Sequence, residues 1–491
     1  MTALRHSHTL RGLSLLIAAC FVTRPVPAQY SGSAASPETS IYVFRADQSA
    51  VVQTGGMACV YWTYSIAGQF QLTVDPNAGT AFFAHVAAKA TDDSPLQRTL
   101  DPNQVFNLAA LVGTVIDKTT IQFTGQAVDA SAVQLTVALR GDSAQLIGQT
   151  MPPPRSADFF LFNLDAVAQR KYGGGAGEPN DPYRIATAAH LIALGETATD
   201  YGKHFVLTAD VDLDPNRPGG KVFDKAVIAP DTDPLNEDFQ GTPFTGTFDG
   251  RGHRISRLTI KGGGYLGLFG LLGRRGWLPL AVVENLGVSD VNLVGAGRNV
   301  GGLAGRTAGV VTRCHSTGAV SGESDVGGLA GRNLGTMIRC YSTSAVSNTD
   351  SYVGGLLGSN GGAVAQCYSA GNLSGGFHVG GLVGHNDGSV TQCYSTGAVG
   401  GLRSVGGLIG SNSDLYQGQG IVTLCFWDMQ TSGQATSAGG TGKAKAEMQT
   451  AATFLAAGWD FVGETVNGTE DIWWILEGKD YPRLSWENVG Q

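Results

Sequence analysis

Thiols, rings and hydrogen-bonding side chains recur together in the second half of this chain at nearly constant spacing. The segments are Arg313-Cys314-His315-Ser316, Arg339-Cys340-Tyr341-Ser342, Gln366-Cys367-Tyr368-Ser369 and Gln392-Cys393-Tyr394-Ser395, with Cys425-Phe426-Trp427 as a variant. Thiols can form disulfides or bind metal ions, and rings can stack on planar ligands and on sugars. Which of these reactions or contacts the side chains can make depends on which of them the fold buries.

The cysteines are expected to be buried free thiols. Zinc binding needs ligand pairs at short local spacing, such as C-x-x-C, and the chain contains none. If the repeats stack as rungs, equivalent cysteines lie about 4.8 Å apart, which suits either disulfides or a ladder of thiols. Leu286 and Leu258 occupy the same phase in the preceding units, at steps of 28 residues. A position that accepts Leu as well as Cys is a core position, which favours free thiols.

The rings that follow the cysteines form the candidate ligand-binding site. Because side chains alternate between the two faces of a strand, an inward Cys places the next residue outward. The sequence therefore predicts an exposed stripe made of His315, Tyr341, Tyr368 and Tyr394. Such a stripe suits the face of a sugar. The alternative is that the rings only stack on one another and stabilise the rungs.

Three aspartates form the candidate metal site. Asp210, Asp212 and Asp214 place carboxylates on one face of a strand or loop, and carboxylate oxygens are ligands of calcium. We expect either a calcium site or a solvated acidic edge. The segment is not an EF-hand, because Pro215 stands where the turn glycine is needed. No other cofactor is expected.

No residues are predicted to be catalytic. The acids near the repeats, Asp325, Asp350 and Asp387, are expected in corners and do not share one repeat phase. The chain also lacks the His-Glu-x-x-His pattern of zinc peptidases.

Five copies of Val-Gly-Gly-Leu-x-Gly set the frame for all these residues. They begin at Val300, Val326, Val353, Val379 and Val405, at steps of 26, 27, 26 and 26 residues. A short fixed period indicates stacked units, none of which buries its apolar face alone. Each unit has room for three short strands and three corners, so residues 244–430 are predicted to form a parallel β-helix. The periodic glycines indicate corners with positive φ and close backbone approach.

A column of asparagines follows the Gly-Leu-x-Gly corner in four copies, at Asn333, Asn360, Asn386 and Asn412. It predicts a ladder in which each side-chain amide bonds to the next rung. Asn also tolerates the left-handed conformation, so these residues are expected in turns.

The chain before the repeats divides into an export signal and a β domain. Basic residues, the apolar run from Leu13 to Val22 and then Val26-Pro27-Ala28 predict a secretory signal peptide over residues 1–28. The alternative is a lipoprotein signal that makes Cys20 a lipid anchor. A flexible start at 29–40 precedes short alternating apolar runs over 41–170, which predict an antiparallel β-sandwich or barrel.

Three further segments flank the predicted β-helix. Residues 171–182 are rich in glycine and proline and are expected to be a linker. Residues 183–243 are expected to supply an N-terminal cap, with a short helix at 185–196, and the first strand of the solenoid. Residues 431–491 are expected to form a C-terminal cap, with a helix at 443–457. The predicted fold is therefore all-β, with short capping helices.

Composition excludes some classes of partner. The chain has 491 residues, of which 42% are apolar and 15% are charged, and its formal net charge is −8. A net acidic chain argues against nucleic-acid binding, which needs clustered Lys and Arg. Beyond the signal, no stretch is apolar and long enough to span a bilayer as a helix.

The recurring Gly-Gly-Leu-x-Gly with its Cys-Tyr-Ser partner resembles the GLUG-motif repeat family of bacterial exported proteins, over about Phe244 to Trp427. The resemblance implies a right-handed β-helix on a secreted or cell-surface protein. Proteins of this family are often adhesin-like and mostly lack an assigned activity.

The expected function is that of an exported, non-enzymatic β-helix protein that serves in adhesion or as a structural element. Its partner would be a surface glycan or a protein. The alternatives are a carbohydrate-binding module and a glycan-cleaving β-helix enzyme, either a lyase or a glycosidase.

Overall fold

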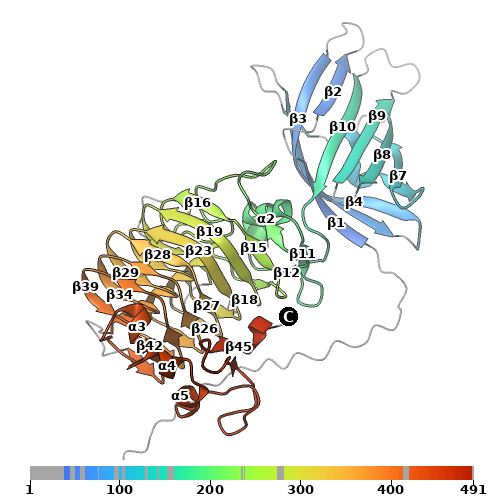
Figure 1. Ribbon diagram of the computed structural model, residues 1–491. Coiled ribbons are helices and arrows are strands. Elements are labelled where there is room, and N and C mark those ends of the chain that lie inside the picture. Colours follow the sequence, from blue (N-terminus) through green and yellow to red (C-terminus); the bar gives the residue numbers. More distant parts are fainter. Residues whose placement is uncertain are drawn as a thin grey trace, which may run out of the picture.

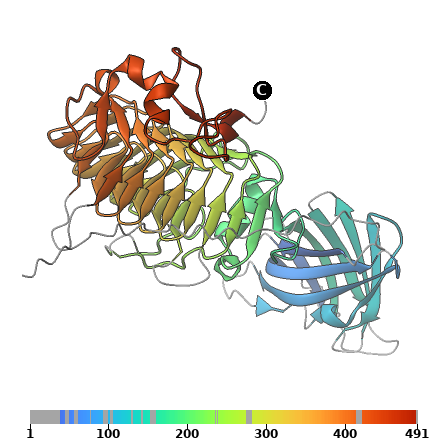
Figure 2. The same cartoon turned by 90° about the horizontal axis from the view of Figure 1, so that it is seen from below.

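The computed structural model describes residues 38–44, 50–55, 61–75, 77–92, 99–101, 105–127, 131–140, 143–151, 160–233, 236, 238–273, 281–412 and 420–488. The predicted signal peptide, with Cys20, lies outside these residues, as does Cys59. Within the described part, an antiparallel barrel precedes a stack of parallel rungs (Figures 1 and 2). The predicted fold class, a β-helix preceded by an antiparallel domain, is confirmed.

The antiparallel domain is a closed barrel. Its strands are β1 (Glu38–Phe44), β2 (Ala50–Gly55), β3 (Tyr61–Asp75), β4 (Thr80–Asp92), β5 (Thr99–Leu100), β6 (Val112–Val115), β7 (Thr120–Gln126), β8 (Ala132–Arg140), β9 (Ser143–Met151) and β10 (Phe160–Arg170). β1, β3, β4, β6, β7, β8, β9 and β10 pair in that order, and β10 pairs with β1 to close the ring. Closure decides between the two architectures that the sequence left open.

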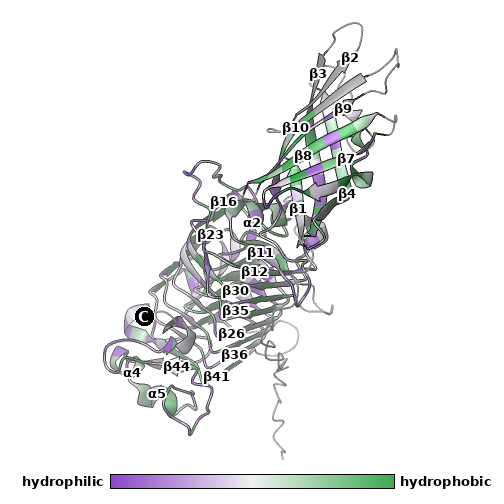
Figure 3. Cartoon of the chain, turned by 90° about the vertical axis from the view of Figure 1, so that its right-hand side faces the viewer, coloured by the Kyte–Doolittle hydropathy of each residue, from purple (hydrophilic) through white to green (hydrophobic). Residues whose placement is uncertain are grey.

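Alternation along the barrel strands builds its core. In β7, Ile121 and Phe123 are buried while their neighbours are not, and β8 repeats the pattern. The hydropathy of these strands alternates in the same way (Figure 3). The inward side chains pack around Phe70, Phe83 and Phe123, whose rings contact one another in sequence. A period of two with one apolar face is what a half-buried strand needs.

The β-helix consists of four parallel sheets. Sheet I contains β11 (Tyr183–Ile185), β12 (His204–Leu207), β14 (Thr247–Asp249), β18 (Val282–Glu284), β22 (Val310–Thr312), β26 (Thr336–Ile338), β31 (Ala363–Ala365), β36 (Ser389–Thr391) and β41 (Ile421–Thr423). Sheet II contains β13 (Val211–Asp212), β15 (Arg254–Ser256), β16 (Thr259–Gly262), β19 (Gly287–Gly295), β23 (His315–Gly322), β27 (Tyr341–Ser342), β28 (Ala345–Asn348), β32 (Tyr368–Ser369), β33 (Leu373–Ser374), β37 (Tyr394–Ser395), β38 (Val399–Gly400), β42 (Phe426–Asp428) and β43 (Thr441–Lys443).

The two shorter sheets carry the glycine motif. Sheet III contains β17 (Phe269–Leu272), β21 (Ala304–Thr307), β25 (Ala330–Asn333), β30 (Leu357–Asn360), β35 (Val383–Asn386) and β40 (Ile409–Ser411). Sheet IV contains β20 (Arg298–Gly301), β24 (Ser324–Gly327), β29 (Ser351–Gly354), β34 (Phe377–Gly380) and β39 (Arg403–Gly406). One turn of the helix therefore holds more short strands than the three expected, as β24 to β28 illustrate.

Backbone conformation and close packing at the corners explain which residues recur in each repeat. The residue before each Val-Gly-Gly, such as Asp325 or Tyr352, has positive φ, and so does the residue before each cysteine, such as Arg339. The motif glycines do not, so their expected role at positive φ is wrong. They allow close approach instead, because a Cβ on Gly355 would collide with the hydroxyl of Ser369. The two motifs of each unit are therefore packing partners.

Short helices close the ends of the stack. The helices are α2 (Ala188–Gly195), α3 (Met429–Ser432), α4 (Lys445–Met448) and α5 (Ala451–Leu455). The Thr187 side chain caps α2 by accepting the His190 N–H at 3.2 Å. The single helix expected at 443–457 is two short ones. None of the helices in the described residues is long and apolar enough to cross a membrane.

The glycine-rich segment between barrel and β-helix is packed rather than loose. Tyr172 is buried against the rings of Tyr183 and Phe205. The buried Lys171 ammonium lies 2.7 Å from Oδ2 of Asp200, which also accepts the Tyr172 hydroxyl. Composition suggested a linker, but aromatic burial holds this segment to the first rungs.

Candidate functional site

The predicted ring stripe exists as a column of stacked rings. The ring centroids of His315 and Tyr341 are 4.8 Å apart, those of Tyr341 and Tyr368 are 4.9 Å apart, and those of Tyr368 and Tyr394 are 5.0 Å apart. Neighbouring planes are inclined by 8° or less. In-register pairing of β23, β27, β32 and β37 imposes this spacing.

The ring column is largely covered, because Tyr368 and Tyr394 are buried and His315 and Tyr341 are half-buried, which corrects the predicted exposure of the stripe. Tyr368 is 4% exposed and Tyr394 is 2% exposed, because residues 445–488 fold back over them. We name residues 445–488 the C-terminal clasp, which is red in Figures 1 and 2. The Trp486 ring contacts His315 and Tyr341, and the Trp473 ring contacts Tyr368 and Tyr394. The clasp includes the two-stranded sheet of β44 (Trp473–Trp474) and β45 (Arg483–Leu484).

Polar contacts fix the clasp along the column. The Tyr368 hydroxyl donates to Oε2 of Glu487 at 3.0 Å, and the Tyr394 hydroxyl donates to the Pro482 carbonyl. The indole N–H of Trp486 donates to the Arg339 carbonyl at 3.0 Å. Burial raises the pKa of the Glu487 carboxyl. These contacts make the column a docking surface for the chain's own C-terminal part.

Burial also changes the pKa of His315, the first ring of the column. Desolvation, with a smaller contribution from the Arg254 charge, lowers the pKa of the His315 imidazole to about 4. His315 is therefore neutral near pH 7. The imidazole extends over Gly287 of the preceding rung, where a Cβ would collide with it.

The cysteines form a column of free buried thiols, as predicted. Cys314, Cys340, Cys367, Cys393 and Cys425 are all free and buried. Each thiol of the next rung accepts the backbone N–H of the cysteine before it, at 3.3 to 3.4 Å. Leu286 precedes Cys314 in this column, but Leu258 lies beside Val291 in another. Burial raises the pKa values of the Cys340, Cys367, Cys393 and Cys425 thiols, which disfavours their reactive thiolate form.

The three aspartates of the predicted calcium site are paired with cationic side chains. Asp210 accepts from Arg254 Nε at 3.0 Å, and Asp212 accepts from Arg257. Arg257 Nη1 also lies 3.2 Å from Oδ2 of Asp214. The described residues contain no group of three or more His, Cys, Asp or Glu side chains placed to hold a metal ion. The expected convergence of these carboxylates on one cation is therefore not observed.

The asparagine ladder is present but lies inside strands. Nδ2 of Asn333 donates to Oδ1 of Asn360 at 2.8 Å, and the same bond joins Asn360 to Asn386 and Asn386 to Asn412. Asn333, Asn360 and Asn386 end strands of sheet III, are buried, and do not have positive φ. The predicted amide ladder is confirmed, whereas the predicted left-handed turn is wrong.

A polar hollow at the corner between sheets III and IV was not expected from the sequence. Two columns of side chains meet there, and in both columns the residue type differs from rung to rung. The column before each Val-Gly-Gly contains Asn299, Asp325, Tyr352, His378 and Ser404. The facing column in sheet III contains Arg306, Arg332, Ser359, His385 and Ser411.

The hollow, which we name the corner hollow, has a volume of about 280 Å³. The Ser359 hydroxyl donates to the buried carboxylate of Asp325 at 2.5 Å. Nε2 of His385 lies 2.9 Å from Oδ1 of Asp387. The Tyr352 ring stacks on His378 at 5.1 Å, and its centroid is 5.2 Å from that of His385. The lining residues are Arg298, Ser324, Asp325, Arg332, Tyr352, Ser359, Asn360, Gly361, His385 and Asp387.

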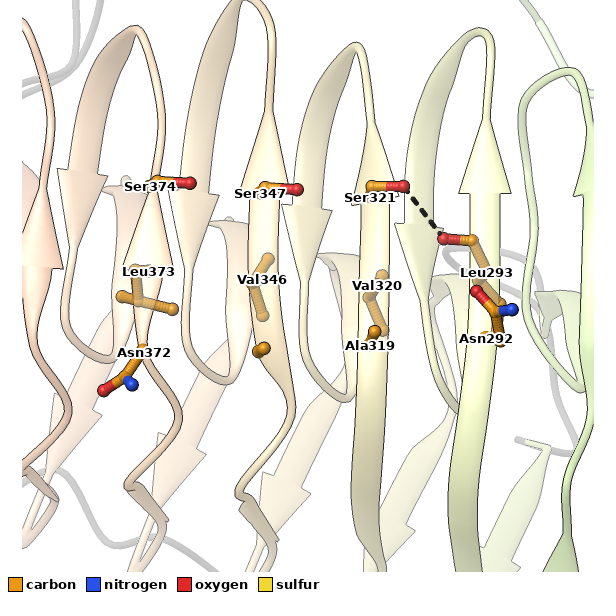
Figure 4. A pocket seen from close by; sticks show the side chains of 11 residues that line it. Asn292, Leu293, Ala319, Val320, Ser321, Val346, Ser347, Asn372, Leu373 and Ser374 are labelled. Atoms are coloured by element: carbon orange, nitrogen blue, oxygen red, sulfur yellow. Dashed lines mark hydrogen bonds between the residues drawn. The ribbon is translucent and has the colours of Figure 1, made fainter.

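A second, shallower hollow lies on the outer face of sheet II (Figure 4). Ser321, Ser347 and Ser374 form one row of its lining, and Ser321 Oγ donates to the Leu293 carbonyl at 3.1 Å. The lining contains only Ser, Ala, Asn and aliphatic side chains. This surface lacks the charged and aromatic groups that fix the orientation of a ligand, so the corner hollow is the stronger candidate.

The signal for the corner hollow was present in the repeat itself. The core column of Ala304, Ala330, Leu357, Val383 and Ile409 stays apolar in every copy, whereas positions 325, 352 and 378 carry Asp, Tyr and His in turn. Alignment of the copies for variable positions would have found this column. Asp325 and Asp387 occupy different phases of the repeat, so the repeat alone does not bring them together.

One family model matches within the repeat region, and two curated proteins are similar to part of the chain. Residues 375–400 match the model of the GLUG motif, which confirms the resemblance there. Halomucin of Haloquadratum walsbyi is 30% identical over 202 residues, which are 40% of this chain and 2% of that protein. A putative Gly-rich membrane protein of Evansella cellulosilytica is 33% identical over 148 residues, which are 28% of this chain and 15% of that protein.

The chain therefore spans a small fraction of the length of the curated relatives it matches. No solved structure matches it.

Proposed function

We propose that this protein is exported and acts at the cell surface or outside the cell in attachment. A stack of rungs with constant interior columns supports a corner whose side chains vary from rung to rung. In repeat proteins, the constant positions hold the stack together and one varied face carries the binding. This contrast between a constant core and a variable corner is the observation that carries the proposal.

The relatives support a location at the surface. One is named halomucin and the other a putative Gly-rich membrane protein, and they are similar to 40% and 28% of this chain. The predicted signal peptide, with or without a lipid at Cys20, supplies the export route. Cells that produce the full-length protein should expose it to protease added outside, and mass spectrometry of the released chain shows whether it begins near Gln29 or at a lipidated Cys20.

A role in carbohydrate binding is the second candidate, and the corner hollow favours it. Cleavage of a glycan and binding of calcium remain predictions. Beads coated with the purified mature chain should adhere to extracellular polysaccharide from the producing organism. The matched control is a coat of residues 29–170 alone, which end with the last barrel strand. Equal adherence of both coats would contradict attachment through the β-helix.

A further inference from the structure

We propose that the corner hollow binds one pyranose ring of a glycan. The inference deepens the proposed function and rests on it, since it names the site and the class of ligand for attachment. It depends on three observations, which are the origin of the hollow, its aromatic wall and its balanced charges.

The hollow arises because one rung carries small side chains where its neighbours carry large ones. Ser359 lies between Arg332 and His385 in the same column of sheet III. Gly361 lies in the same rung as Ser359, at the position that Leu334 and Asp387 occupy in the adjacent rungs. Both substitutions remove volume at one point, and the larger neighbours above and below become the walls.

The size and one wall suit a sugar ring. A volume of about 280 Å³ is at the lower limit of ligand pockets, which favours a single ring over a long segment. His378 covers the Tyr352 ring from the next rung, so the other face of the ring is turned toward the rung of Asp325. The C–H face of a pyranose packs on an aromatic face of this kind.

The remaining walls offer donors and acceptors in balance. The carboxylates of Asp325 and Asp387 accept hydrogen bonds from hydroxyl groups, and the guanidinium groups of Arg298 and Arg332 donate to hydroxyl oxygens. Ser359 and His385 hold the two carboxylates in place. Burial and the nearby Asp325 charge raise the pKa of the Tyr352 phenol, so its hydroxyl keeps its proton.

This balance argues against a simple ion. A phosphate or sulfate ion would face the carboxylates of Asp325 and Asp387, and a metal cation would face the guanidinium groups of Arg298 and Arg332. Neighbouring hydroxyl groups of a sugar donate and accept at once, so they satisfy both kinds of group.

The test is titration of the mature protein with the methyl pyranosides of glucose, galactose, mannose and glucuronic acid, observed by saturation-transfer NMR. We expect at least one of them to bind in the millimolar range. Ser359→Arg should weaken that binding at least ten-fold, because it fills the hollow with the side chain that Arg306 and Arg332 already place in this column. Gly361→Leu, which copies Leu334, is the second filling variant.

The matched control is Ser411→Arg, the same change in the same column two rungs away, which should leave binding unchanged. Three results would overturn the proposal: no binding of any pyranoside, equal loss in the control, or saturable binding of inorganic phosphate in place of the sugars. If beads coated with Ser359→Arg still adhere, attachment is supported and only the assignment of binding to the corner hollow is contradicted. If the protein binds pyranosides but the beads do not adhere, the corner hollow is supported and attachment is contradicted.

Discussion

The Tyr368 hydroxyl donates a hydrogen bond to the Glu487 carboxylate at 3.0 Å, across 119 residues of sequence. This bond joins the middle of the β-helix to the last turn of the described chain. Around it, the clasp and the ring column share one apolar core that is distinct from the interior of the rungs. The part of sheet II that carries the ring column is therefore covered by the protein itself, so this column is not a free surface for recognition.

Loss of a clasp ring should destabilise the β-helix. Trp473 is fully buried against Tyr368 and Tyr394, so Trp473→Ala should cost about 3–5 kcal/mol of unfolding free energy. Tyr394→Phe keeps the ring and loses only the bond to Pro482, at about 1 kcal/mol. Urea unfolding monitored by tryptophan fluorescence measures both. Equal midpoints for Trp473→Ala and the wild type would mean that the clasp is not docked in solution.

The thiol column should be unreactive in the native protein. Iodoacetamide followed by peptide mapping should leave Cys314, Cys340, Cys367, Cys393 and Cys425 unmodified until denaturant is added. Cys367→Ala should cost less than Cys367→Asp, which buries a charge among apolar neighbours and should cost several kcal/mol, on the order of 3–5. A disulfide between any two of these cysteines in the unreduced protein would refute the free column.

Stability should fall as the pH drops from about 6.5 to 4. The folded pKa of His315 is about 4 and its ordinary value is 6.5, so between these values the unfolded chain binds more protons. While His315 is neutral in both states, above pH 6.5, it does not reduce the free energy of unfolding. By pH 4, protonation of His315 in the unfolded chain lowers that free energy by up to about 3 kcal/mol. His315→Tyr, which copies the residue in the next three rungs, should remove this part of the pH dependence. An unchanged pH profile in His315→Tyr would assign the loss to other groups.

The asparagine ladder predicts a graded effect of position. Asn360→Ala leaves Oδ1 of Asn386 without its partner in the ladder, at about 1–3 kcal/mol for a buried group. It also reduces Nδ2 of Asn333 to its 3.4 Å contacts with the Gly335 and Ala363 carbonyls. Asn412 ends the ladder, so Asn412→Ala removes a single rung-to-rung contact and should cost less. Thermal melting of the two variants measures the difference. Equal melting temperatures would show that the amides bond to water as well as to each other.

The architecture was predictable because the repeat fixes both period and phase. Five copies of Val-Gly-Gly-Leu-x-Gly place equivalent residues on adjacent rungs, and the free thiols and amide ladder follow from stacking alone. The outward direction of the rings was also predicted correctly, since Tyr368 and Tyr394 pack in the clasp core and not in the rung interior, although their exposure was not. Local periodicity determines all of these features.

Contacts between distant segments were not predictable in the same way. Nothing near Tyr394 in the sequence shows that the Pro482 carbonyl and the Trp473 ring cover it, because the clasp lies outside the repeat. The pairing of Asp210 with Arg254 and of Asp212 with Arg257 was not predictable either, because these partners lie 44 and 45 residues later in the sequence. The corner hollow needed the facing columns of two sheets, whose register only the structure supplies.

A glycan array probed with three purified proteins tests the central claim most directly, because it asks which surface of the β-helix recognises sugars. The wild type should label a subset of glycans, and Tyr394→Phe, changed at the clasp, should keep that profile. The signal of Ser359→Arg on the same glycans should be at least ten-fold lower than that of the wild type. A Ser359→Arg profile equal to the wild type, with loss of signal in Tyr394→Phe, would contradict the assignment of recognition to the corner hollow.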